Sequence, residues 1–168
     1  SFTYPAYNNG WTFTANPTGE IEMNDKKYNY LFWEGSDAKF IASQNEIDGI
    51  TVNADTLLNF LENGLATMGF NSKEAQDFIT FWYPQMIKNE MNNIRFIFND
   101  ECNAFARINV SPKPENIYRM SMIWNQCTVE NTQKLNLQKF PVIKRSGLTI
   151  IEWGGVEIDE FEFSSSSK

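Results

Sequence analysis

The sequence contains no histidine. This absence excludes Ser-His-Asp and Cys-His catalysis, zinc sites built with histidine, and haem held by a histidine ligand. Basic residues are also few, with 14 Lys and Arg against 21 Asp and Glu, which gives a formal net charge of -7. An acidic chain repels phosphate backbones and anionic lipid headgroups, so we expect no nucleic-acid partner. Apolar runs of the roughly 20 residues that span a bilayer are missing too, so we expect no membrane insertion.

The motifs of cofactor enzymes are missing as well. The sequence has neither a GxGxxG nor a P-loop pattern for phosphate groups. The acidic stretches FNDECN (98–103) and EIDEFE (157–162) could offer oxygen ligands to calcium, but neither has the spacing of an EF-hand. We therefore interpret both as solvated surface and expect no cofactor and no bound metal.

The two cysteines, Cys102 and Cys127, leave two alternatives open. An even number permits one disulfide, and two buried thiols fit equally well. Cys102 has no histidine base and no evident basic neighbour in sequence, so a nucleophilic role is not expected.

What the chain has in quantity is apolar and aromatic residues, 42% and 15% of its 168 residues. Such a chain can bury a core, and its length suits a single domain, which we place at 1–163 with a flexible Ser-rich tail at 164–168. So high an aromatic share indicates a sheet-rich core, an exposed aromatic binding face, or both.

Alternating apolar residues predict strands over residues 1–45 and again from Asn93 onward. The expected strands are GWTFTANP (10–17), EIEM (20–23), KYNYLFWEG (27–35, as a central strand), AKFIAS (38–43), IRFIFND (94–100), ECNAFARINV (101–110), NIYRMSMIW (116–124) and LTIIEW (148–153). The segment 135–147 is expected to connect across the surface, and VEIDEFEF (156–163) to form a solvated edge strand or arm.

Between these strands the apolar period changes from 2 to 3.6, which predicts two helices over 53–92. Asn53 or Asp55 can cap the first helix and Gly69 can end it. A capping box from Asn71 to Glu74 begins the second. Pro84 is expected to kink this helix or to end it near Trp82. The resulting fold class is α+β, a mainly antiparallel sheet or a β-sandwich with an inserted helical hairpin.

One short pattern occurs twice, as Trp33-Glu34-Gly35 and as Glu152-Trp153-Gly154-Gly155. If the two meet, Glu34 and Glu152 could act as the acid and base of a glycan-acting enzyme, with Trp33 and Trp153 stacking on the sugar. The simpler interpretation, which we favour, is that both belong to the framework. The indoles then plug the core, and Gly154 and Gly155 allow a bulge or a reversal with positive φ. Trp33, Glu34 and Trp153 remain the candidate binding residues.

The motifs YNYLFWEG, GFNSKEAQDFITFWYPQM, INVSPKPENIYRMSMIW and GLTIIEWGG together resemble a pattern of uncharacterised bacterial proteins that are secreted or lie on the cell surface. The resemblance covers about residues 10–155. It implies an extracellular or cell-surface location and a framework role for both Trp/Glu/Gly motifs, and it implies no activity. A chain that begins at Ser1 is also compatible with a removed secretion signal.

These observations favour a non-enzymatic extracellular or cell-surface module that binds a protein or glycan partner, or that takes part in a surface assembly. Aromatic and Asn side chains suit such contacts. Self-association is also expected, because the acidic edge at 156–163 could add to a neighbouring sheet. The alternatives are the carboxylate-dependent enzyme and an intracellular protein-interaction domain.

Overall fold

The structure of the protein is a computed structural model, which describes residues 2–35, 48–131, 136–159 and 161. The chain separates into two compact units, unit 1 at Ser1–Lys39 and unit 2 at Phe40–Lys168. The predicted single domain at 1–163 stays a prediction, as does the tail at 164–168, and the predicted strand at 38–43 lies outside the described residues.

Unit 1 consists of short antiparallel strands. A two-stranded ribbon pairs β1 (Phe2–Tyr4) with β5 (Phe32–Glu34), and a three-stranded sheet has the order β2 (Thr14–Ala15), β3 (Ile21–Met23), β4 (Lys26–Tyr28). The β3–β4 hairpin turns at Asn24 and Asp25, both with positive φ, as a tight two-residue hairpin requires.

The long central strand predicted at 27–35 is therefore wrong. It divides into β4 and β5, which belong to different sheets, with residues 29–31 between them. The predicted strand at 10–17 is likewise reduced to β2. Aromatic alternation marked these segments as strand-like, but a pattern of alternation does not specify how far a strand continues or which strand it pairs with.

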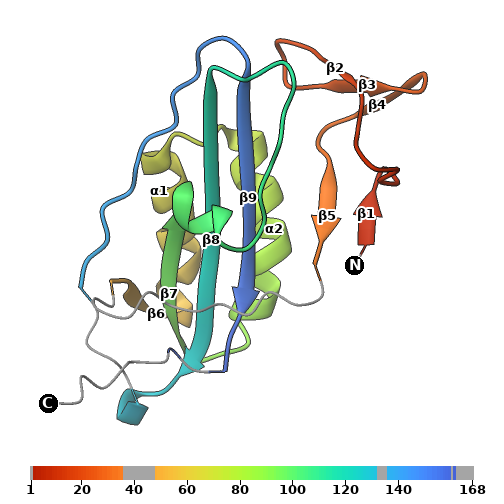
Figure 1. The fold of residues 1–168 in the computed structure, drawn as a ribbon. Helices are drawn as coiled ribbons and strands as arrows, with labels where there is room; N and C mark the ends of the chain where they lie inside the picture. The colour runs from red at the N-terminus through yellow and green to blue at the C-terminus, as the bar shows by residue number, and fades with distance from the viewer. Residues whose placement is uncertain (1, 36–47, 132–135, 160, 162–168) are drawn as a thin grey trace, which may run out of the picture. The chain divides into compact units, whose positions relative to one another are not determined.

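Unit 2 has a four-stranded sheet with two helices on one face (Figure 1). The strand order is β6 (Ile50–Asn53), β7 (Met91–Phe98), β8 (Asn116–Cys127) and β9 (Thr149–Glu157), and the helices are α1 (Ala54–Met68) and α2 (Ser72–Met86). The pairs β6–β7 and β7–β8 are antiparallel, whereas β8–β9 is parallel. The expected fold class is confirmed, since the protein is α+β with a helical hairpin inserted among mainly antiparallel strands. The four-stranded sheet packs against the two helices of this hairpin.

The helix signals were largely correct. Gly69 ends α1 with φ of 88°, and the capping box of Asn71 and Glu74 begins α2. Asn53 precedes α1 without a side-chain cap. The helix does not end near Trp82, because α2 continues through Pro84 to Met86. Only the last turn follows Pro84, so the ring removes little of the helical hydrogen bonding there.

The core lies between the helices and the sheet. Leu57, Leu61 and Leu65 of α1 and Phe78, Trp82 and Met86 of α2 pack against Ile94 and Phe96 of β7 and against Tyr118, Met120, Met122 and Trp124 of β8. Strands β7 and β8 are buried on both faces, which explains their nearly continuous apolar sequence.

The opposite face of the sheet is covered differently. The short helix α3 (Asp100–Asn103) and the loop after it lie there in front of β8 (Figure 1). A strand was predicted at 101–110, and this prediction is wrong. Residues 104–115 form no strand and no helix, although their apolar residues alternate.

The segment after β9 is also more buried than predicted. Phe161 is buried with Ile97, Cys102 and Ile123 in a second apolar cluster, and the Ile158 amide donates to the Trp124 carbonyl at 2.9 Å. Val156 and Ile158 pack against the same cluster. Of the described residues from Val156 to Phe161, only the acidic residues Glu157 and Asp159 are exposed.

Candidate functional site

The two Trp/Glu/Gly motifs lie in different units. Trp33 and Glu34 are exposed residues of β5 in unit 1. Glu152 and Trp153 are partly buried residues of β9 in unit 2. The hypothesis of a joint acid and base at Glu34 and Glu152 therefore stays a prediction.

Trp153 belongs to the helix side of the sheet. Its ring meets Phe78 of α2 edge to face with centroids 5.3 Å apart, and Phe81 at 6.3 Å. It packs against the main core cluster while remaining partly exposed at the end strand of the sheet. These contacts favour the framework interpretation for this indole.

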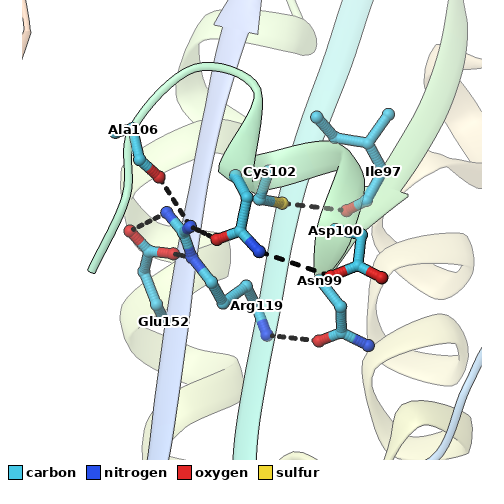
Figure 2. A network of polar contacts seen from close by, with 8 residues as sticks. Ile97, Asn99, Asp100, Cys102, Ala106, Arg119 and Glu152 are labelled. Carbon is cyan, nitrogen blue, oxygen red and sulfur yellow. Dashed lines mark hydrogen bonds and ion pairs between the residues drawn. The ribbon is translucent and has the colours of Figure 1, made fainter. Parts of the chain in front are cut away.

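Glu152 points to the other face, where it binds Arg119 of β8 (Figure 2). The Arg119 Nε donates to one carboxylate oxygen of Glu152, and the Nη2 donates to the other oxygen at 3.1 Å. The exposed fraction is 4% for the Arg119 side chain and 18% for that of Glu152. A bidentate ion pair of this kind fixes both side chains and compensates the free-energy cost of desolvating the guanidinium.

Arg119 also holds the loop that follows α3. Its Nη1 donates to the Asn103 side-chain oxygen at 2.7 Å and to the Ala106 carbonyl at 2.6 Å. The guanidinium thus makes four hydrogen bonds, counting the two to Glu152. A guanidinium has five N–H groups, so little of this one remains for an external anion.

Asn99 binds the start of α3 to strand β8. Its backbone lies at φ 43° and ψ -101°, a conformation that L-residues rarely adopt. Its side-chain oxygen accepts from the Arg119 amide at 3.0 Å, and its own amide donates to the Arg119 carbonyl at 3.0 Å. These two bonds hold the strained residue in place.

A shallow hollow of about 250 Å³ opens beside this network. It is lined by Asn99, Asp100, Asn103, Ile108, Ile117 and Arg119. The Arg119 network is saturated with its own partners, so its arrangement favours a structural role over ligand capture.

A second buried arginine repeats the arrangement on the neighbouring strand. Arg95 of β7, 8% exposed, contacts Asp48 at 2.8 Å and Glu101 of α3 at 3.0 Å. Neither arginine was predicted from the sequence as an organising residue. The signal was present, because an arginine within an apolar strand such as IRFIF or IYRMSMIW requires an acidic partner once buried.

The two cysteines are free and buried. Cys102 contacts the Ile97 carbonyl, whereas Cys127 pairs with Met91 at the other end of β7. Six residues of strand separate these sites by about 20 Å, and a disulfide needs Cα atoms within roughly 7 Å. Of the two alternatives, the structure therefore has the two buried thiols.

Burial raises the pKa of the Cys102 thiol to about 11, although nearby Arg119 acts in the opposite direction. Burial raises the pKa of Cys127 as well. The thiolate is the reactive form, so neither residue is set up as a nucleophile at neutral pH.

We predict that iodoacetamide at pH 7.5 labels Cys102 only after unfolding. The raised pKa stabilises the folded protein below the ordinary thiol pKa, and this contribution is lost as the pH rises from about 9 to about 11. Mass spectrometry of native and urea-unfolded samples measures the labelling. Rapid native labelling of Cys102 would contradict the prediction.

Among the described residues, no group of three His, Cys, Asp or Glu side chains could hold a metal ion. In the stretch 98–103 Glu101 pairs with Arg95, and in the stretch 157–162 Glu157 and Asp159 are exposed. None of the described helices has the length and apolar character to cross a membrane. Comparisons with protein-family models, with curated proteins and with solved structures give no match.

In unit 1, the geometry gathers aromatic rings on the β1–β5 ribbon. Opposed residues in an antiparallel pair point to the same face, so Tyr4 and Phe32 share one face and Thr3 and Trp33 share the other. Phe2 lies on the face of Tyr4, with its ring centroid 5.9 Å from that of Phe32. Tyr4 also meets Tyr28 edge to face at 5.8 Å. We call Phe2, Tyr4, Tyr28 and Phe32 the aromatic face of unit 1.

Proposed function

We propose that the protein is a non-enzymatic module, extracellular or on the cell surface, that binds a partner through the aromatic face of unit 1. The observation that carries this proposal is the exposure of unit 1's large rings. Within the aromatic face, the side chains of Phe2 and Tyr4 are 57% and 58% exposed. Exposed aromatic patches of this kind mark sites of interaction more often than isolated surface rings do.

Both apolar clusters are made by unit 2. Of the described residues, their members all come from residue 50 onward. The ring contacts of Phe2 with Phe32 at 5.9 Å and of Tyr4 with Tyr28 at 5.8 Å hold the side chains of the aromatic face in place. Rings that are fixed before binding lose little conformational entropy on contact with a partner.

The chemistry of the rings suits two kinds of partner. Tyrosine and tryptophan combine a flat apolar surface with a polar edge, which stacks on sugar rings and also anchors protein interfaces. The family resemblance, which implies a secreted or surface location, is compatible with either. A catalytic role for Glu34 and Glu152 has no such supporting observation.

The test is a titration of intrinsic tryptophan fluorescence with a panel of soluble glycans, alongside chemical cross-linking to surface-protein extracts. For whichever partner binds, we expect Tyr4→Ala to weaken the affinity about tenfold, the typical effect of removing a central anchor ring. Trp33→Ala, on the opposite face of the same ribbon, should change it little.

The two variants form a matched pair, because both remove an exposed ring from the same short ribbon. Equal losses would place the contact elsewhere and contradict the aromatic face. A saturable glycan response favours a glycan, and cross-linking with a flat glycan response favours a protein. A flat result in both arms would overturn the proposed function.

A further inference from the structure

We propose that β9 is the pairing edge of a symmetric dimer, in which the β9 strands of two copies join antiparallel and make one continuous sheet. Strand β9 ends the order β6-β7-β8-β9, and Figure 1 shows it at one margin of the four-stranded sheet. The proposal concerns unit 2 and does not depend on the aromatic face of unit 1.

The backbone of β9 presents a regular row of outward groups. Leu148 accepts from the amide of Asn116, and the Ile158 amide donates to Trp124, so the even-numbered residues bond to β8. Backbone groups alternate along a strand, and the odd-numbered ones therefore point away from β8. These residues are Thr149, Ile151, Trp153, Gly155 and Glu157. Within the described part of the chain, β8 is the only strand that pairs with β9.

This edge lacks the usual protection against pairing. Native edge strands are commonly short, or carry proline, lysine or a bulge. Strand β9 runs for 9 residues without proline or lysine, and its register with β8 is continuous. Gly154 and Gly155 are partly exposed, and with no side chain the exposed atoms are those of the backbone.

The other margin of the sheet is protected. Strand β6 has only 4 residues, and before it Gly49 donates to the Asn136 carbonyl at 2.7 Å. Beyond the reach of β6, the Gln138 side chain bonds both the amide and the carbonyl of Phe96, each at 2.7 Å. A head-to-tail stack would need both margins, so the open edge favours pairing with its own copy, which closes the assembly at two chains.

The strand is self-complementary in the register centred on Trp153. Ile151 then lies opposite Gly155, Thr149 opposite Glu157, and Trp153 opposite its own copy. Ile151 therefore meets a residue without a side chain, the two indoles meet each other, and no acid meets its copy. Each odd-numbered pair exchanges two hydrogen bonds, about ten in all by the antiparallel rule. Phe81, a 41% exposed ring of α2 beside Trp153, adds apolar surface on the helix side.

The test is the mass of the full chain by sedimentation, with Ile151→Pro and Ile151→Ala compared. The Ile151 amide points outward, so proline there removes an intermolecular donor without breaking the β8–β9 ladder. Alanine removes the same side chain and keeps the amide. We expect a dimer for the unchanged chain and for Ile151→Ala, and at least a hundredfold weaker dimer for Ile151→Pro with an unchanged circular dichroism spectrum.

Hydrogen exchange on the unchanged chain tests the proposal even if the Ile151→Pro variant does not fold. In the unchanged chain, dilution should release the amides of Ile151, Trp153 and Gly155, while Ile150 and Glu152, bonded to β8, stay protected. A monomer at every concentration would overturn the proposal. A dimer with unprotected odd-numbered amides would overturn it too, as would one that persists in a folded Ile151→Pro.

Discussion

Replacing Gly155 with alanine is expected to lower the free energy of unfolding by about 1–3 kcal/mol, the range for overpacking a well-filled core. A Cβ atom at this position would lie 2.8 Å from Cζ2 of Trp82 and 2.9 Å from the carbonyl oxygen of Met122. One neighbour is a rigid buried indole and the other is backbone of the central strand β8, so neither can yield cheaply.

Gly154 is the matched control for this substitution. It is the preceding residue in the same strand, and a Cβ there would meet only the Ser121 hydroxyl oxygen, at 3.8 Å. Neither glycine has a positive φ. Gly154→Ala should therefore be neutral or stabilise by about 0.4–1 kcal/mol, because alanine reduces the conformational entropy of the unfolded chain.

Urea unfolding of the two variants measures this difference directly. Equal stabilities would mean that the α2–β9 contact can adjust by a few tenths of an ångström. The structural reason for the pair of glycines would then lie elsewhere.

The structural role of the two glycines could not be predicted from the sequence. The pair predicted a bulge or a reversal with positive φ, and that prediction was wrong, because both residues sit in a regular stretch of β9. Glycine also marks places where another group approaches the backbone closely. Which of the two roles applies depends on Trp82, which lies 73 positions earlier in the sequence.

The helical hairpin could be predicted because its signals are local. The capping box of Asn71 and Glu74 and the left-handed end at Gly69 are readable within a few residues. The parallel pairing of β8 with β9 depends on long-range contacts instead. The crossover 136–148 passes the end of α1, where the Ile143 amide donates to the Met68 carbonyl at 2.9 Å, and no local pattern encodes that path.

In the candidate site, too, one feature could be predicted from a local pattern and another depends on long-range contacts. Glu152 was singled out from a repeated motif, and the structure gives it a partner, Arg119, that the motif does not contain. An arginine inside an apolar strand indicates that the fold must supply an acidic partner. The register of β8 on β9 determines which acid this is, because it places Arg119 directly beside Glu152.

Removing that acid is the second change with a large expected effect. Glu152→Ala should cost about 3–5 kcal/mol of unfolding free energy, the usual result of leaving a buried charge without its partner. Arg119 is 4% exposed and cannot turn into water without releasing Asn103 and Ala106. Glu157→Gln is the control, since Glu157 is an exposed acid of the same strand and its loss should cost less than about 0.5 kcal/mol.

A double variant separates the charge from the packing. Arg119→Met with Glu152→Leu removes both charges and keeps apolar bulk, and such replacements of buried pairs are often neutral. If the buried charge dominates, the double variant should be more stable than Glu152→Ala alone. Thermal unfolding followed by circular dichroism orders the variants.

The outcome bears on function because it decides between two roles for Glu152. A Glu152→Ala variant that unfolds readily, with stability restored in the double variant, identifies Glu152 as the partner that the folded sheet requires for Arg119. A loss no larger than that of Glu157→Gln would mean that Arg119 finds water through the hollow lined by Asn99 and Ile117. Glu152 would then not be required for the stability of the folded sheet.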